Sequence, residues 1–175
     1  MRTERVQYPH GIGERHAAPV SGWQRHASPL SLAAFGVVVV LALMGVLGHE
    51  RQWVSDTNGT RMSIHMPEVI RNGEFLEIRV EVRSTRQIGQ LAIGVDQALW
   101  EDLTINTLIP AATDEASEDG EFRFGFGELA ADTSFLLKID AQVNPDILGG
   151  NQGRVTVYDG DEALSTLDVD MTVLP

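Results

Sequence analysis

The sequence has no cysteine among its 175 residues, and only 13 basic side chains stand against 25 acidic ones. The absence of cysteine excludes a disulfide-stapled scaffold, a thiolate metal site, a cysteine nucleophile and a thioether lipid anchor. The excess of acidic residues gives a formal net charge of −12, which opposes phosphate backbones and argues against nucleic acid as a partner. The length allows one domain of ordinary size with appendages.

Residues that could carry catalysis or bind zinc are also scarce. Only His49 and His65 follow residue 48, and no Gly-x-Ser-x-Gly sequence occurs. His65 alternates with apolar residues and is most simply a solvent-facing strand residue. A Ser–His–acid triad needs a histidine beside a nucleophile, and zinc needs three or four ligands gathered together. We therefore predict that the protein is not an enzyme and that it has no catalytic residues and no cofactor.

The first 29 residues differ in charge from the rest of the chain. They contain four arginines and two glutamates, and Pro9, Pro19 and Pro29 are spread through them without any apolar period. Such a segment cannot bury enough apolar surface to offset the entropy that ordering costs. We predict a disordered cytoplasmic tail over residues 1–29.

Residues 30–48 form a run of 19 positions without a charge. A helix of this length spans about 28 Å at ~1.5 Å per residue, close to the roughly 30 Å core of a bilayer. We predict a single transmembrane helix, retained as an anchor, because both the run and its leader are longer than in a typical cleaved signal peptide. Trp23 and Arg25 on one side, and Arg51 and Trp53 on the other, are the predicted membrane-interface residues.

The distribution of arginine predicts the orientation. Four arginines precede the apolar run, whereas Arg51 and Arg61 are the only basic residues in the fifteen or so that follow it. The positive-inside rule therefore places the N-terminus in the cytoplasm. The C-terminal part is then periplasmic or extracellular and belongs to a protein of the cytoplasmic membrane.

Residues 49–175 carry most of the acidity and a period-two apolar pattern. We divide them into a juxtamembrane stalk, 49–60, and an exported domain, 61–175. Alternation of apolar and polar residues predicts strands over residues 62–66, 76–83, 91–95, 103–108, 122–126, 135–143, 154–158 and 163–173. Turn sequences separate them at Asn72-Gly73, Asp119-Gly120, Asn144-Pro145-Asp146, Gly149-Gly150-Asn151 and Asp159-Gly160-Asp161. We expect a mainly β fold, an antiparallel sandwich of about seven to nine strands, with one short helical turn at 111–117.

The valine hairpin around an Asp-Gly turn, Val155-Thr156-Val157-Tyr158-Asp159-Gly160, resembles the last strands of bacterial immunoglobulin-like modules. The layout of an apolar segment followed by such a domain is similar to bacterial single-pass membrane proteins. The resemblance implies an immunoglobulin-like β-sandwich for residues 60–175. It implies nothing about a ligand, because fold alone does not determine function.

Carboxylates are the one abundant kind of reactive or metal-binding side chain in the exported domain. Clustered carboxylate oxygens in loops are the donors that calcium prefers. The candidate calcium ligands are Asp114, Glu115, Glu118, Asp119, Glu121, Asp159 and Asp161. Neither acidic stretch fits a twelve-residue calcium loop, and the alternative interpretation is a set of solvated turns.

Two hypotheses of function remain open. In the first, the protein is a noncatalytic accessory that displays an acidic sandwich outside the membrane and contacts another membrane or envelope protein. Trp100 is the candidate partner-contact residue, although a core position for this side chain is the favoured interpretation. In the second, the exported domain binds calcium or a small ligand through its acidic loops.

Overall fold

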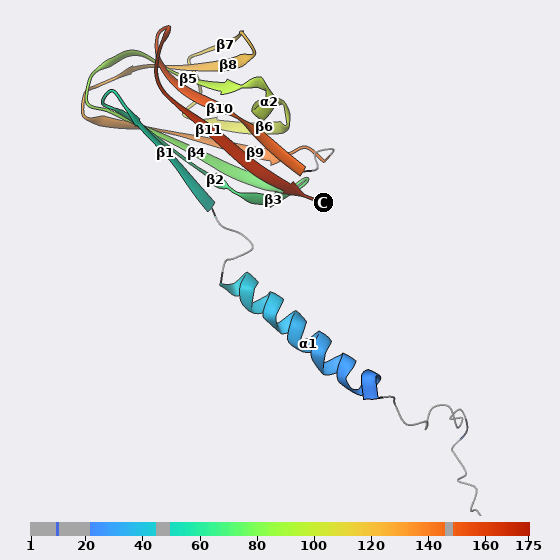
Figure 1. The fold of residues 1–175 in the computed structure, drawn as a ribbon. Coiled ribbons are helices and arrows are strands. Elements are labelled where there is room, and N and C mark those ends of the chain that lie inside the picture. The colour runs from blue at the N-terminus through green and yellow to red at the C-terminus, as the bar shows by residue number, and fades with distance from the viewer. Residues whose placement is uncertain (1–9, 11–21, 45–49, 146–148) are drawn as a thin grey trace, which may run out of the picture. The chain divides into compact units, whose positions relative to one another are not determined.

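The computed structural model describes residue 10 and residues 22–44, 50–145 and 149–175, and for residues 22–27 it describes the backbone only. The chain divides into two units, residues 1–46 and residues 47–175. Figure 1 shows a helix in the first unit and strands in the second. Each unit is described below by itself.

The first unit contains helix α1 (Gly22–Leu43), which begins eight residues before the predicted start of the apolar run. The prediction of disorder is therefore wrong for residues 22–29. The rest of the predicted tail, except residue 10, and residues 45–48 of the predicted span lie outside the described residues. Across the described part of the chain, no helix combines the length and the apolarity that crossing a membrane requires.

The second unit is built from two sheets, which we name sheet A and sheet B. Sheet A has the strand order β1 (Glu50–Thr57), β2 (Thr60–Pro67), β4 (Phe75–Ser84), β9 (Thr133–Val143) and β6 (Leu103–Ile109). Sheet B has the order β3 (Val69–Arg71), β11 (Glu162–Leu174), β10 (Gly149–Asp159), β5 (Ile88–Asp96), β8 (Glu121–Leu129) and β7 (Asp114–Glu118). Every pairing is antiparallel except that of β11 with β3.

The period-two pattern of the sequence places one face of each sheet in a shared core. Strand β4 alternates between buried Ile78, Val80 and Val82 and outward-facing Arg79 and Glu81. Sheet B contributes its own inward row, in which Ile93 on β5 lies opposite Val157 on β10 and Phe124 on β8. The prediction of a mainly β, two-sheet sandwich is confirmed. The described residues contain 11 strands, more than the seven to nine that we predicted.

The predicted helical turn at 111–117 is wrong, because this region contains strand β7. Asp119 and Gly120 both have positive φ, 51° and 79°, as a two-residue hairpin turn requires. This turn pairs β7 with β8 along five residues. The short helix of the second unit is instead α2 (Gln97–Glu101). Gly149-Gly150-Asn151 is part of β10 and not a turn, and Asp146 of another predicted turn lies outside the described residues.

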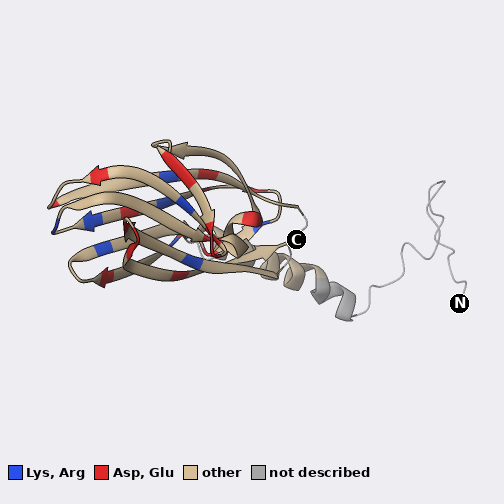
Figure 2. Ribbon diagram, turned by 90° about the horizontal axis from the view of Figure 1, so that it is seen from above, with Lys and Arg blue, Asp and Glu red and all other residues tan. Residues whose placement is uncertain are grey.

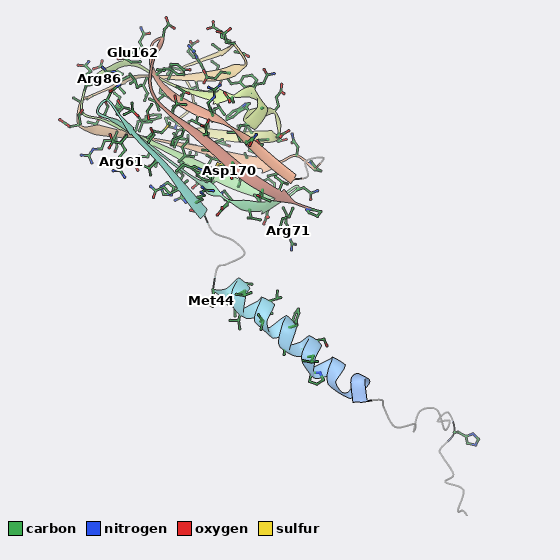
Figure 3. The ribbon with its side chains drawn as sticks, viewed as in Figure 1. Met44, Arg61, Arg71, Arg86, Glu162 and Asp170 are labelled. Atoms are coloured by element: carbon green, nitrogen blue, oxygen red, sulfur yellow. The ribbon has the colours of Figure 1, made fainter. Side chains whose placement is uncertain are left out.

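The predicted stalk, residues 49–60, is also wrong as far as it is described, because residues 50–57 form strand β1. This strand pairs with β2 over its whole length, and Trp53 opposite Ile64 is buried in the core. Trp53 is therefore not a membrane-interface residue. Arg51 lies 4.9 Å from the Trp53 ring centroid and forms ion pairs with Glu68 and Asp170, the latter labelled on β11 in Figure 3. The side chains of Trp23 and Arg25 lie outside the described residues.

Candidate binding groove on the outer face of sheet B

The outer face of sheet B has small residues at its centre. Ala92 on β5 lies opposite Tyr158 on one side and Gly125 on the other. In the next row, Gly94 on β5 lies between Thr156 on β10 and Arg123 on β8. Because β5 has almost no side-chain volume at these two positions, side chains from β8 reach across it to β10.

Glu121, Arg123 and Tyr158 form a polar cluster across β5. The Tyr158 hydroxyl donates a hydrogen bond of 2.8 Å to Glu121 Oε2, and Arg123 Nε donates one of 3.1 Å to the same oxygen. The Arg123 guanidinium carbon lies 4.1 Å from the centroid of the Tyr158 ring, a cation–π geometry. A Cβ atom on Gly94 would overlap the Glu121 carboxyl group, so glycine at this position leaves room for the cluster.

The cluster shifts two pKa values in directions that its geometry explains. Burial of the phenol raises the pKa of Tyr158, and the hydrogen bond to Glu121 raises it further. The hydrogen bond from Arg123 to Glu121 raises the pKa of the Arg123 guanidinium, partly opposed by desolvation. Both groups therefore keep their protons at neutral pH. The charge of Arg123 is offset by Glu121, so it does not leave a free cation on this face.

A groove lies beside the cluster and encloses about 360 Å³. We call it the sheet B groove. Ala92, Gly125 and Gly127 contribute to its floor, and the β7 residues Asp114, Ala116 and Glu118 line one side. The lining also includes Gln90, Arg123, Gly160 and Asp161. Its volume is within the range of small-ligand sites, but it is an open depression with carboxylates at its rim.

The structure disperses the seven candidate calcium ligands. Asp114, Glu115 and Glu118 alternate between the two faces of β7, and Asp119 lies in the turn that follows. Glu121 is held by Arg123 and Tyr158, and Asp159 Oδ1 accepts a hydrogen bond of 2.9 Å from the Gln90 backbone N–H. Asp161 is fully exposed. In the described residues, no group of three or more His, Asp or Glu side chains is placed to hold a metal ion.

Charged residues lie along the strands of the second unit as well as at their ends, as the coloured ribbon of Figure 2 shows. Several pair across the sheets, for example Arg86 with Glu162 at 3.3 Å, both labelled in Figure 3, and Arg154 with Asp96 at 3.4 Å. His65 is half-buried on β2, opposite Arg79. The domain surface is therefore a mixed-charge surface with an acidic excess around the sheet B groove.

Trp100 lies in α2 and packs against the core. Its ring centroid is 4.8 Å from that of Phe124 and 6.4 Å from that of Phe122. The side chain is partly buried against the core cluster. This placement agrees with the interpretation of Trp100 as a core residue and gives no support to a partner-contact role.

The comparisons with known proteins show a general likeness to solved structures and assign no role to any residue. No protein-family model matches the sequence, and no curated protein matches it. One similar solved structure is the CARDB domain of the PF1109 protein from Pyrococcus furiosus in complex with di-metal ions, with 12% identity and a TM-score of 0.44 over 69% of this chain and 93% of that chain. Another is CaCohA2 from Clostridium acetobutylicum, with 12% identity and a TM-score of 0.39 over 59% and 85%. We transfer neither ligands nor partners from these structures.

Sequence reasoning missed the polar cluster and the groove. It assigned Glu121 to an acidic loop and did not single out Arg123, and it used Tyr158 only as a strand residue. The available indication was the combination of Ala92 and Gly94 on one face of a strand, with Gly125 and Gly127 two residues apart on another. Small residues on the polar face of a strand indicate a close approach of other groups.

Proposed function

We propose that this chain is a noncatalytic, membrane-anchored accessory protein whose immunoglobulin-like exported domain binds another membrane or envelope protein through the sheet B groove. The observation that carries the proposal is the groove itself, an open depression with a floor of small residues and a rim of carboxylates. Arg123, which lines the groove, is already paired with Glu121 of the adjoining polar cluster. A satisfied polar cluster is suited to holding a rigid surface for a partner.

Two features support the membrane anchor. Residues 30–48 carry no charge and are long enough to match a bilayer core of roughly 30 Å. The described apolar side chains of α1 are exposed, including Leu30, Phe35 and Leu43 at 64%, 68% and 82%. Exposed apolar surface on this scale indicates a contact with lipid or protein. With the N-terminus in the cytoplasm, residues 50–175 lie outside the cytoplasmic membrane.

The anchor is tested by extracting membranes of the expressing cell with alkaline carbonate. We expect the chain to stay in the membrane pellet, and a variant with Val38→Asp and Leu41→Asp to be released. Protease added to intact spheroplasts should degrade the second unit and spare the N-terminal tail. Release of the unaltered chain by carbonate would refute the anchor.

The binding role is tested by purification of the full chain from its own membranes in mild detergent. We expect one protein to co-purify in a fixed ratio, and Ala116→Trp, which fills the sheet B groove from β7, to abolish that association. Ser117→Trp is the matched control, because its side chain lies on the other face of the same strand. Equal recovery of the partner with both variants would exclude the groove as the binding site.

A further inference from the structure

Strand β7 has an edge that no other strand of the described residues covers. It is the last strand of sheet B, where its one described partner is β8, and all five of its residues are exposed. In a two-residue hairpin, the residues that flank the turn exchange both of their hydrogen bonds, and every second residue along the strand does the same. Glu118, Ala116 and Asp114 therefore bond to β8. Glu115 and Ser117 direct their backbone N–H and C=O groups toward the open edge.

Hydrogen bonds within the chain hold the start of β7 in place, without a bound partner protein. The Thr113 backbone N–H and the Thr113 hydroxyl both donate to the Gly125 carbonyl oxygen, at 2.8 Å and 3.0 Å. At the other end, the Asp119-Gly120 turn fixes the register with β8. The open edge is therefore an ordered template, and a strand that adds to it does not bear the cost of ordering β7.

The same strand lines the sheet B groove. Asp114, Ala116 and Glu118 line it with their side chains, and Asp161 carries a further carboxylate on the groove lining. A strand added beside β7 would place one residue opposite Ala116, with Asp114 and Glu118 as its diagonal neighbours. Diagonal cross-strand neighbours lie ~7–8 Å apart at the backbone, within reach of a long side chain. The methyl group of Ala116 leaves room for that side chain to enter the groove.

The charges along β7 determine which kind of strand can pair with its open edge. Two copies of β7 brought edge to edge would oppose Asp114, Glu115 and Glu118 of each chain, and such like-charge pairs are destabilising. A second copy of this chain is therefore disfavoured at this edge. A strand that carries lysine or arginine at alternate positions would instead meet carboxylates on the groove face, since the nearby Arg123 is already paired with Glu121.

We infer that the edge of β7 and the adjoining groove bind an extended segment of a partner protein that presents lysine or arginine at every second residue, added to sheet B as a further strand. This inference rests on the proposed binding role of the same groove. Backbone hydrogen bonds at Glu115 and Ser117 supply the pairing, and the basic side chains select the segment through Asp114 and Glu118.

The test uses the full chain in mild detergent and a nine-residue peptide of alternating threonine and lysine, with a threonine–glutamate peptide as control. We expect the lysine peptide to bind and the glutamate peptide not to bind. Methylation of backbone nitrogens in the lysine peptide should then distinguish strand pairing through backbone hydrogen bonds from simple charge attraction. In an antiparallel addition, the threonine amides face β7, so methylating them abolishes binding, whereas methylating the lysine amides leaves it intact. A parallel addition reverses the two outcomes.

Variants of the chain give a second readout. Ser117→Pro removes an edge N–H without removing a β7–β8 ladder bond, and we expect it to weaken the lysine peptide about tenfold or more, compared with Ser117→Ala. Asp114→Asn combined with Glu118→Gln should weaken binding about fivefold. Glu115→Gln is the matched control, because the same strand carries this carboxylate on its other face. Circular dichroism confirms that each variant keeps its strands.

The outcomes distinguish this inference from the proposed function. Equal sensitivity to both methylation patterns, or insensitivity to both, overturns strand addition. Equal binding of the lysine and glutamate peptides overturns the assignment of a basic partner. If either result occurs while Ala116→Trp still abolishes partner co-purification, the groove binds a partner by another mode. If Ala116→Trp has no effect, the proposed function itself fails.

Discussion

The replacement of Gly94 by alanine tests the polar cluster directly. Gly94 lies on β5, beneath the Glu121 side chain that crosses to Tyr158, and an added Cβ would overlap the Glu121 carboxyl group. The carboxyl is the far end of a flexible side chain, so it swings away at little steric cost. The energetic effect of Gly94→Ala is therefore the loss of the hydrogen bonds that Glu121 accepts.

The structure allows the magnitude to be estimated. The hydrogen bond from Tyr158 to the charged Glu121 contributes about 1.5–3 kcal/mol. The ion pair with Arg123 is only partly exposed, at 12% and 25% of the two side chains, and adds about 0.5–1 kcal/mol. Alanine in a strand is favoured over glycine by roughly 0.5–1 kcal/mol. We expect Gly94→Ala to lower the free energy of unfolding by about 1–3.5 kcal/mol.

A double-mutant cycle with Glu121→Ala isolates the cause. Without the Glu121 carboxyl, the alanine at position 94 has nothing to displace, so we expect Gly94→Ala to raise stability by about 0.5–1 kcal/mol in that background. Urea unfolding of the full chain in mild detergent, followed by the fluorescence of Trp53 and Trp100, measures all four corners of the cycle. An equal loss of stability in both backgrounds would refute the reasoning.

Three further predictions concern the second unit. The raised pKa of Tyr158 means that the folded state holds the phenol proton more tightly than the unfolded state does. The contribution of Tyr158 to stability should therefore be fully present below pH about 10 and fall as the pH rises above it, and Tyr158→Phe should remove this slope in unfolding measurements from about pH 8 to 12. Trp100→Ala should lower the free energy of unfolding by about 2–4 kcal/mol, because it removes the packing on Phe124; a loss below 1 kcal/mol would contradict that placement. Calcium at millimolar concentration should leave the Tm unchanged, since the candidate carboxylates are dispersed, and a clear rise in Tm by calorimetry would overturn this.

The fold is predictable from the sequence where apolar and polar residues alternate. Leu76, Ile78, Val80 and Val82 alternate with charged residues, and such a pattern admits only a half-buried strand. Strand β1 was missed because Trp53 is its one buried residue and the adjacent Val54 breaks the apolar–polar alternation. Its partner β2 follows directly after the Asn58-Gly59 turn, in which both residues have positive φ, so the local sequence encodes this hairpin although β1 was not predicted.

Strand β7 shows the same limit more sharply. Its sequence, Asp-Glu-Ala-Ser-Glu, has low strand propensity and resembles the first turn of a helix. Asp119-Gly120 is predicted as a turn, but the β-hairpin that such a turn implies is not predicted. A two-residue turn with positive φ at both positions sends the chain back along itself, so the residues on its two sides must pair. The turn, and not the propensity of the five residues before it, makes β7 a strand.

The placement of the β7 carboxylates favours the proposed protein partner over a metal ion. Carboxylates on consecutive residues of a strand point alternately to opposite faces, so Asp114 and Glu115 cannot converge on one ion, as calcium coordination would require. Asp114 and Glu118 instead lie on one face, on either side of Ala116, so a partner side chain opposite Ala116 would have both carboxylates as diagonal neighbours. We therefore expect these carboxylates to read the charges of an extended chain, the role proposed for the edge of β7, and not to gather around a metal ion.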